Sequence, residues 1–154
     1  FIFGVEDSLV STVGLLSGIA ITGMESKTIL ITGVVLIFVE AFSMAVGSFL
    51  SEHSAEEYQM RAETSLRNPL LDGGIMFVSY FFSGFIPLFP YIILSSDIAL
   101  WYSIGLSLAA LFLLGVVGAK FSRLNILKSG FRMLIVGGIA IAVGIIAGRI
   151  VNGS

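Results

Sequence analysis

Asp7, Glu40 and Met44 combine two carboxylates with a thioether, and they fall in the first two apolar stretches of the chain. Glu40 lies near the middle of the apolar run from Thr28 to Leu50, and Met44 follows it by four residues. Residues at this spacing share one face of a helix. Carboxylate oxygen and thioether sulfur together suit a borderline first-row ion such as Fe²⁺ or Mn²⁺ better than Mg²⁺ or Ca²⁺. The three residues therefore predict a path for a divalent transition-metal cation.

Glu40 can bind either a metal ion or a proton. Competition for one carboxylate is a physical basis for exchange, because loading one ion displaces the other. One subunit offers few ligands, whereas a divalent ion takes about four to six. Two copies that meet across a symmetry axis would double the ligand set, which favours a homodimer.

Structural roles are the alternative for these side chains. Methionine commonly fills gaps in a core, so Met44 is also consistent with packing alone. Glu40 is also consistent with a protonated carboxyl group that hydrogen-bonds to a neighbouring helix. We favour a functional Glu40, because a carboxylate in the middle of a bilayer costs a few kcal/mol and commonly marks an ion or substrate path.

A charged stretch without glycine or proline follows from Ser51 to Leu66. It predicts a helical extension of the second span beyond the membrane. Two pairs of side chains in it are four residues apart and share a face, namely Glu52 with Glu56 and His53 with Glu57. A solvated charged face is one interpretation, and a weak cation-collecting surface at the mouth of the path is the other. Glu56 is the weakest of the candidate metal ligands.

Helices that cross a membrane must position these residues. The chain is 56% hydrophobic and 12% charged, whereas soluble domains are about 25% charged. A span needs about 20 mostly apolar residues, and five stretches qualify, at residues 3–22, 28–50, 70–94, 98–118 and 131–151. We predict an all-α integral membrane protein. It has a single five-helix transmembrane domain over residues 1–154, and its second helix extends into the cytoplasm.

The first of these stretches is the least apolar. Asp7, Ser11 and Gly14 or Gly18 recur in it at helical spacing, so one face of the helix is polar and small. A helix that contacts only lipid does not have this composition. We therefore expect this face to contact other helices or to line the path.

Proline and glycine indicate how the later helices end and pack. Asn68–Pro69 predicts the end of the helical extension. Pro87 and Pro90 free backbone carbonyls that neighbouring helices or water must satisfy. Gly144 and Gly148 form a pair of small residues four apart, which permits close contact between helices.

The basic residues predict how the chain is oriented. Lys120–Lys128 predicts a basic loop on the same side of the membrane as the stretch after the second span. Lys27 and Arg149 belong to the other side. Basic residues concentrate on the cytoplasmic side of membrane proteins, so we expect a cytoplasmic N-terminus and a C-terminus across the membrane. The six basic residues on the predicted cytoplasmic side are Arg61, Arg67, Lys120, Arg123, Lys128 and Arg132.

Several classes of function are excluded by what the chain lacks. There is no cysteine, which rules out disulfides, thiolate metal sites and cysteine nucleophiles. The single histidine, His53, rules out sites built from several histidines. No hydrolase, metalloprotease or phosphate-binding motif is present, and no basic run indicates nucleic acid. We expect no enzyme and no permanently bound cofactor.

Three motifs resemble those of the vacuolar iron transporter family. Gly4–Thr12 (GVEDSLVST) is similar to its first-helix motif, and Ala41–Ser51 (AFSMAVGSFLS) to its second-helix motif. Asn68–Pro69 together with Ser83–Tyr91 (SGFIPLFPY) is similar to its third-helix signature. The glycine-rich last span also fits. The resemblance covers essentially the whole chain, and the motifs are specific in combination.

This resemblance implies a five-helix homodimer that moves Fe²⁺, and often Mn²⁺, out of the cytoplasm in exchange for protons. It implies a metal path along the dimer interface, with Asp7 and Met44 as ligands. Plant members also use a glutamate about two turns before that methionine, where this chain has Leu36. Glu40, one turn before Met44, lies on a nearby face, and we infer that it substitutes.

The chain departs from the plant and yeast types between the second and third spans. Those members carry a long metal-binding domain rich in glutamate and methionine there, whereas this chain has about 20 residues. Some of its acidic residues there are consistent with a vestige of that domain's first helix. The short form is more typical of a prokaryotic plasma membrane than of a vacuole.

Two other functions remain open for this scaffold. One is a carrier of another small solute, with Glu40 as a proton site only. The other is a membrane interaction protein that transports nothing, in which Asp7 and Glu40 are structural. The polar face of the first span argues against the second possibility.

Overall fold

The computed structural model describes residues 1–61 and 65–153, and all of the regular structure within these ranges is helical. Five of the helices are long and apolar enough to cross a membrane. This confirms the predicted all-α class with five spans, and the chain is an integral membrane protein. The helices are α1 (Ile2–Ala20), α2 (Ser26–Met60), α3 (Arg67–Leu88), the short α4 (Pro90–Ile93), α5 (Ser96–Phe121) and α6 (Ile126–Asn152).

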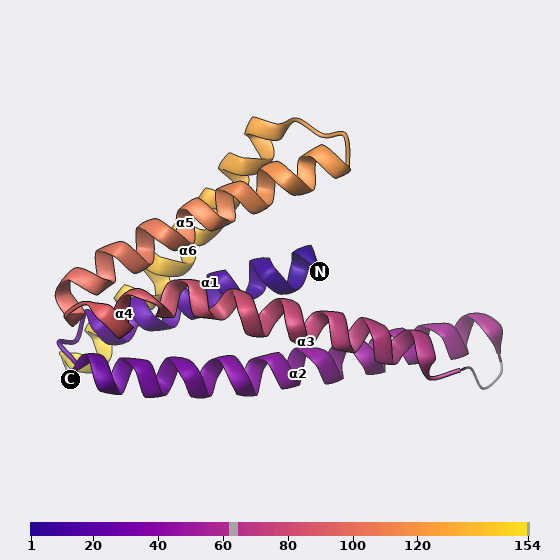
Figure 1. Cartoon of the computed structure of the whole chain (residues 1–154), viewed down its shortest axis with the longest axis horizontal. Helices are drawn as coiled ribbons and strands as arrows, with labels where there is room; N and C mark the ends of the chain where they lie inside the picture. Colours follow the sequence, from indigo (N-terminus) through magenta and orange to yellow (C-terminus); the bar gives the residue numbers. More distant parts are fainter. Residues whose placement is uncertain (62–64, 154) are drawn as a thin grey trace.

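Helix α1 is the centre of the arrangement. It lies between a pair formed by α2 and α3 and a second pair formed by α5 and α6 (Figure 1), and it contacts all four of these helices. Half of the residues in its most apolar 18-residue stretch are buried, whereas only 11% of the residues in the corresponding stretch of α6 are buried. The central place of α1 explains the small and polar residues predicted for one of its faces, because neighbouring helices pack closely around it.

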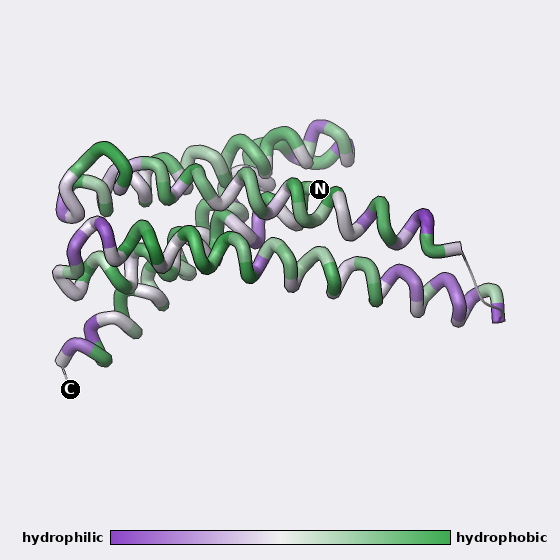
Figure 2. The backbone as a smooth tube through the Cα atoms, turned by 60° about the horizontal axis from the view of Figure 1, so that its bottom comes forward, coloured by the Kyte–Doolittle hydropathy of each residue, from purple (hydrophilic) through white to green (hydrophobic). Residues whose placement is uncertain are grey.

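Helix α2 is longer than a bilayer is thick. Its 35 residues correspond to about 52 Å, whereas the hydrocarbon core measures about 30 Å. The part of α2 towards Met60 is hydrophilic (Figure 2). The helix ends at Met60, where Arg61 adopts a left-handed conformation with φ of 50°. The predicted extension from Ser51 to Leu66 is therefore helical as far as Met60. Residues 62–64, which include the acidic residue Glu63 of that stretch, lie outside the described residues.

The prolines of α3 have two different effects. Asn68 and Pro69 were predicted to end the helical extension of α2, but they lie in the first turn of α3. A proline there costs no helical hydrogen bond, because the N–H groups of the first turn have no partner within the helix. Farther along, α3 ends at Leu88 and Pro90 begins α4, so the single predicted span is interrupted. The carbonyl of Pro87 accepts a hydrogen bond from Ser103 Oγ at 2.6 Å. A neighbouring helix thus satisfies this carbonyl at the interruption, whereas the carbonyls that the two proline rings free are those four residues earlier, of Ser83 and Ile86.

The connection between α5 and α6 is shorter than predicted. The basic loop expected from Lys120 to Lys128 is reduced to residues 122–125, because both helices continue into it. Asn125 stabilises the start of α6, since its Oδ1 accepts a hydrogen bond from the Lys128 backbone N–H at 3.1 Å.

Glycines bring α1 and α6 into backbone contact. A Cβ added at Gly144 would overlap the carbonyl of Gly14, and one at Gly148 would overlap the carbonyl of Gly18. A Cβ added at Gly18 would lie 2.6 Å from the Gly144 oxygen. The predicted close contact of the small-residue pair in α6 is confirmed, and its partner is a matching pair on α1.

Candidate functional site

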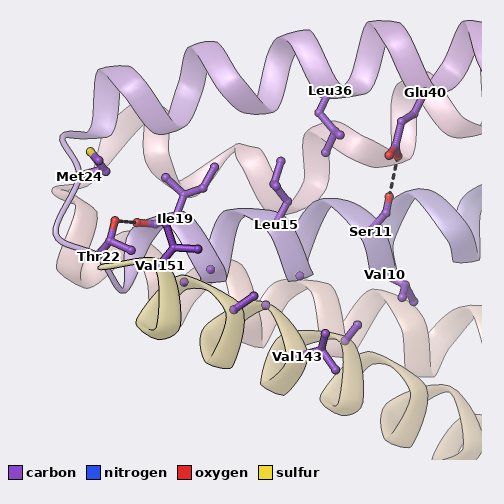
Figure 3. Close-up of a pocket in the computed structure, with 16 residues that line it drawn as sticks. Val10, Ser11, Leu15, Ile19, Thr22, Met24, Leu36, Glu40, Val143 and Val151 are labelled. Carbon is purple, nitrogen blue, oxygen red and sulfur yellow. Dashed lines mark hydrogen bonds between the residues drawn. The ribbon is translucent and has the colours of Figure 1, made fainter. Parts of the chain in front are cut away.

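A groove with a volume of about 650 Å³ opens between α1, α2 and α6 (Figure 3). Most of its lining is apolar, and the glycines of the α1–α6 contact form part of one wall. Ser11 and Glu40 lie at one end, and Thr22, Met24 and Val151 lie at the other. The groove therefore runs along the helices from one polar pair to a helix end.

Glu40 is held at the inner end of this groove by hydroxyl groups from two other helices. Its Oε2 accepts a hydrogen bond from Ser11 Oγ on α1 at 3.0 Å and another from the hydroxyl of Tyr80 on α3. The Ser11 and Tyr80 hydroxyl oxygens are 2.5 Å apart. Neither hydrogen bond uses Oε1. These two hydrogen bonds thus fix one oxygen of the carboxylate.

Close packing of α1, α2 and α3 makes this cluster possible. The backbone carbonyl of Tyr80 accepts a hydrogen bond from Ser8 Oγ at 2.7 Å, and the Tyr80 side chain is fully buried. One turn later, a Cβ added at Gly84 would lie 2.7 Å from Ile37 and 3.0 Å from Ser8 Oγ. A glycine at this position lets α3 approach both other helices, which brings the Tyr80 hydroxyl to Glu40.

Asp7 lies one helical turn before Ser11 and is half-buried. Residues four apart share one face of a helix, and Ser11 Oγ lies 3.0 Å from Glu40 Oε2, so Asp7 lies on the face of α1 that is turned towards Glu40. Two carboxylates within reach of each other repel when both are ionised, and a bound cation relieves this repulsion. The structure therefore brings together two of the predicted metal-site residues from different helices.

Met44 and Glu56 are placed differently from this pair. Met44 is half-buried one turn after Glu40, and neither Met44 nor Asp7 is among the residues that line the groove. Glu56 lies 16 residues beyond Glu40 on the same helix, which corresponds to about 24 Å. Its Oε1 accepts a hydrogen bond from Asn68 Nδ2 at 3.3 Å. Glu56 thus belongs to the hydrophilic end of α2, away from the groove.

Carboxylates alone do not complete a metal site in one chain. Within residues 1–61 and 65–153, no three His, Asp or Glu side chains gather in an arrangement that could hold a metal ion. A metal ion at Asp7 and Glu40 would need further donors, such as hydroxyl oxygens, a thioether, water or groups from a second subunit.

Tyr80 is the site residue that the sequence did not reveal. It is 40 residues from Glu40 and 69 from Ser11, so no local spacing connects them. A weaker signal is present, because Tyr80 carries a polar group inside an apolar span. Buried tyrosine hydroxyls usually have a hydrogen-bond partner, and Glu40 was a candidate partner.

Comparisons with known proteins agree on one family. The model of the VIT family matches residues 1–67 and 53–149. The chain is 26% identical to vacuolar iron transporter homolog 3 of Arabidopsis thaliana over 153 residues, covering 92% of this chain and 76% of that protein. It is 37% identical to the vacuolar iron transporter cccA of Arthroderma benhamiae over 84 residues, or 49% of this chain and 30% of that protein.

Proposed function

The chain belongs to the VIT family, and on this premise we propose that it carries Fe²⁺ or Mn²⁺ across a membrane in exchange for protons. The names of its relatives, which are vacuolar iron transporters or their homologues, support a metal ion as the substrate. The membrane-spanning helices support transport rather than soluble binding. In this proposal the metal ion is the transported substrate, and transport of it requires no permanently bound cofactor.

The observation that carries this proposal is the approach of Asp7 to Glu40 inside a membrane-spanning bundle. Asp7 lies one turn before Ser11 on α1, and Ser11 hydrogen-bonds to Glu40 on α2 at 3.0 Å. Paired acidic groups are costly in a bilayer unless they hold a cation, a proton or each other's hydrogen bonds. Glu40 lines an open groove, which supports an ion path more strongly than a purely structural pair.

The proposed path follows the order of these residues along the helices. Asp7 and Met44 lie on one side of Glu40, and the groove extends on the other side towards Thr22 and Met24. An ion would pass Asp7 and Met44, bind Glu40 and leave along the groove. In a homodimer, a second copy facing this groove would supply the donors that one chain lacks.

The hydrogen bonds to Glu40 support exchange at a single carboxylate. Oε2 keeps its hydrogen bonds from Ser11 and Tyr80, and a metal ion or a proton binds to Oε1 of the same carboxylate. A metal ligand must be deprotonated, so proton and metal exclude each other at this group. Proton release then accompanies metal loading.

Leu36 explains how Glu40 can take the place of the glutamate expected one turn earlier. Leu36 and Glu40 both line the groove. A carboxylate at either position therefore faces the same space. This shared wall supports Glu40 as the substitute for the plant-type residue.

Metal uptake into proteoliposomes tests the proposal. We expect Mn²⁺ entry with wild-type protein, and its loss in Asp7→Asn and in Glu40→Gln. Glu6→Gln is the matched control, because Glu6 is the neighbour of Asp7 and is also half-buried, but points in a different direction on α1. The control should retain wild-type flux.

The outcomes separate the competing functions. Equal flux in all variants would remove Asp7 and Glu40 from the path. Absence of metal flux in intact wild-type protein, together with proton flux, would favour a carrier of another solute. Absence of both fluxes would favour a membrane interaction protein.

A further inference from the structure

A second hollow, with a volume of about 660 Å³, lies at the end of the α5–α6 hairpin, apart from the groove at Glu40. Lys128 and Arg132 line it together with apolar residues that include Leu124, Phe131 and Ile135. All of these residues are exposed. The hollow therefore combines positive charge with an apolar wall on the outside of the bundle.

Charge on this hairpin is unbalanced. No acidic residue follows Asp97 in the chain, whereas Lys120, Arg123, Lys128 and Arg132 fall at this end of α5 and α6. In the part of the chain that the structure describes, neither Lys128 nor Arg132 forms an ion pair. The hollow thus has a local excess of positive charge, although the whole chain has a formal net charge of −2.

Helix α6 places its charged and apolar side chains at this end in two adjacent ridges. Lys128 and Arg132 are four residues apart and form one ridge in the first two turns. Phe131 and Ile135 form the adjacent ridge, with exposed fractions of 58% and 63%. This apolar ridge continues towards the middle of the span, so a ligand with a charged head and apolar chains fits both parts.

We propose that this hollow binds an anionic phospholipid. The phosphate of the headgroup contacts Lys128 and Arg132, and the acyl chains lie along Phe131 and Ile135. Basic residues at a membrane surface attract anionic lipids, and basic pockets beside transmembrane helices bind their headgroups. A free phosphate ion would use the charges but gain nothing from the apolar wall. The proposal is independent of metal transport.

Native mass spectrometry of the purified protein with dioleoylphosphatidylglycerol tests it. Each basic residue near an anionic surface contributes about fivefold to binding, so Lys128→Gln with Arg132→Gln should weaken lipid binding about 30-fold. Arg61→Gln with Arg67→Gln removes the same charge at the end of the α2–α3 pair and should leave binding unchanged. Lys128→Arg with Arg132→Lys should retain it.

Two further probes identify the ligand. Dioleoylphosphatidylcholine should bind much more weakly than phosphatidylglycerol, and inorganic phosphate should not displace the bound lipid. Equal phosphatidylglycerol binding by the two charge-removing double variants would overturn the proposal. So would a change in the monomer–dimer ratio without a change in lipid binding, because the hollow would then be a contact between copies of the chain.

Discussion

The hydroxyl of Tyr80 on α3 donates a hydrogen bond to Oε2 of Glu40 on α2, inside the membrane-spanning part of the protein. Ser11 on α1 donates to the same oxygen. Three helices therefore meet at one carboxylate. This cluster links the fold to the proposed function, because it fixes Glu40 at the inner end of the groove.

Removing the Tyr80 hydroxyl should impair transport without unfolding the protein. A hydrogen bond to a charged group contributes about 1.5–3 kcal/mol, so Tyr80→Phe should lower Mn²⁺ flux at least about tenfold. Tyr91→Phe is the matched control, because Tyr91 is also buried but is not a hydrogen-bond partner of Glu40. Flux measured with equal amounts of reconstituted protein decides this. Equal flux in Tyr80→Phe and wild type would show that Glu40 needs no positioning by this hydroxyl.

A carboxylate should function from either of two positions on the groove wall. Glu40→Leu should abolish Mn²⁺ flux, and adding Leu36→Glu to that variant should restore part of it, since both positions line the groove. Adding Leu36→Gln instead should restore nothing. The prediction fails if the Leu36→Glu and Leu36→Gln combinations have the same flux.

Metal binding should weaken as the pH falls. Protons and metal compete for the carboxylates, so the apparent affinity for Mn²⁺ should decrease on acidification. Glu40→Gln removes one of the competing groups and should flatten the dependence. Titrations of Mn²⁺ binding over a range of pH check this. An unchanged slope in Glu40→Gln would exclude Glu40 as the group at which proton and metal compete.

The contact between α1 and α6 should tolerate no added methyl group. Gly144→Ala would place a Cβ against the Gly14 backbone, and overpacking of this kind typically costs about 1–3 kcal/mol. Gly138→Ala on the same helix meets no atom within 4 Å. Thermal unfolding should show a lower Tm for Gly144→Ala than for Gly138→Ala. Equal Tm values would show that the helices can separate at no cost.

Much of the fold follows from local patterns in the sequence. Apolar runs identify the spans because a helix needs about 20 mostly apolar residues to cross the hydrocarbon core. Gly144 with Gly148 indicates a close helix contact before its partner is known. The predicted helix ends are less accurate than the predicted spans. Helix α6 begins five residues before the predicted span, because Asn125 caps it at its first turn.

The candidate site was predictable only in part. Asp7 and Glu40 stand out because charged groups are costly in apolar runs. The groove and Tyr80 depend on contacts between residues far apart in the chain, which a single sequence does not contain. Leu36 illustrates the difference. The family resemblance implies a glutamate at its position, but only the structure places Leu36 on the same groove wall as Glu40.

Simultaneous recording of metal and proton movement is the most direct test of the central claim. Proteoliposomes containing wild-type protein, Glu40→Gln or Glu6→Gln would receive external Mn²⁺ while a trapped dye reports the internal pH. We predict Mn²⁺ entry with proton exit for wild type and Glu6→Gln, and loss of both signals for Glu40→Gln. Mn²⁺ entry with unchanged proton exit in Glu40→Gln would contradict exchange at this carboxylate.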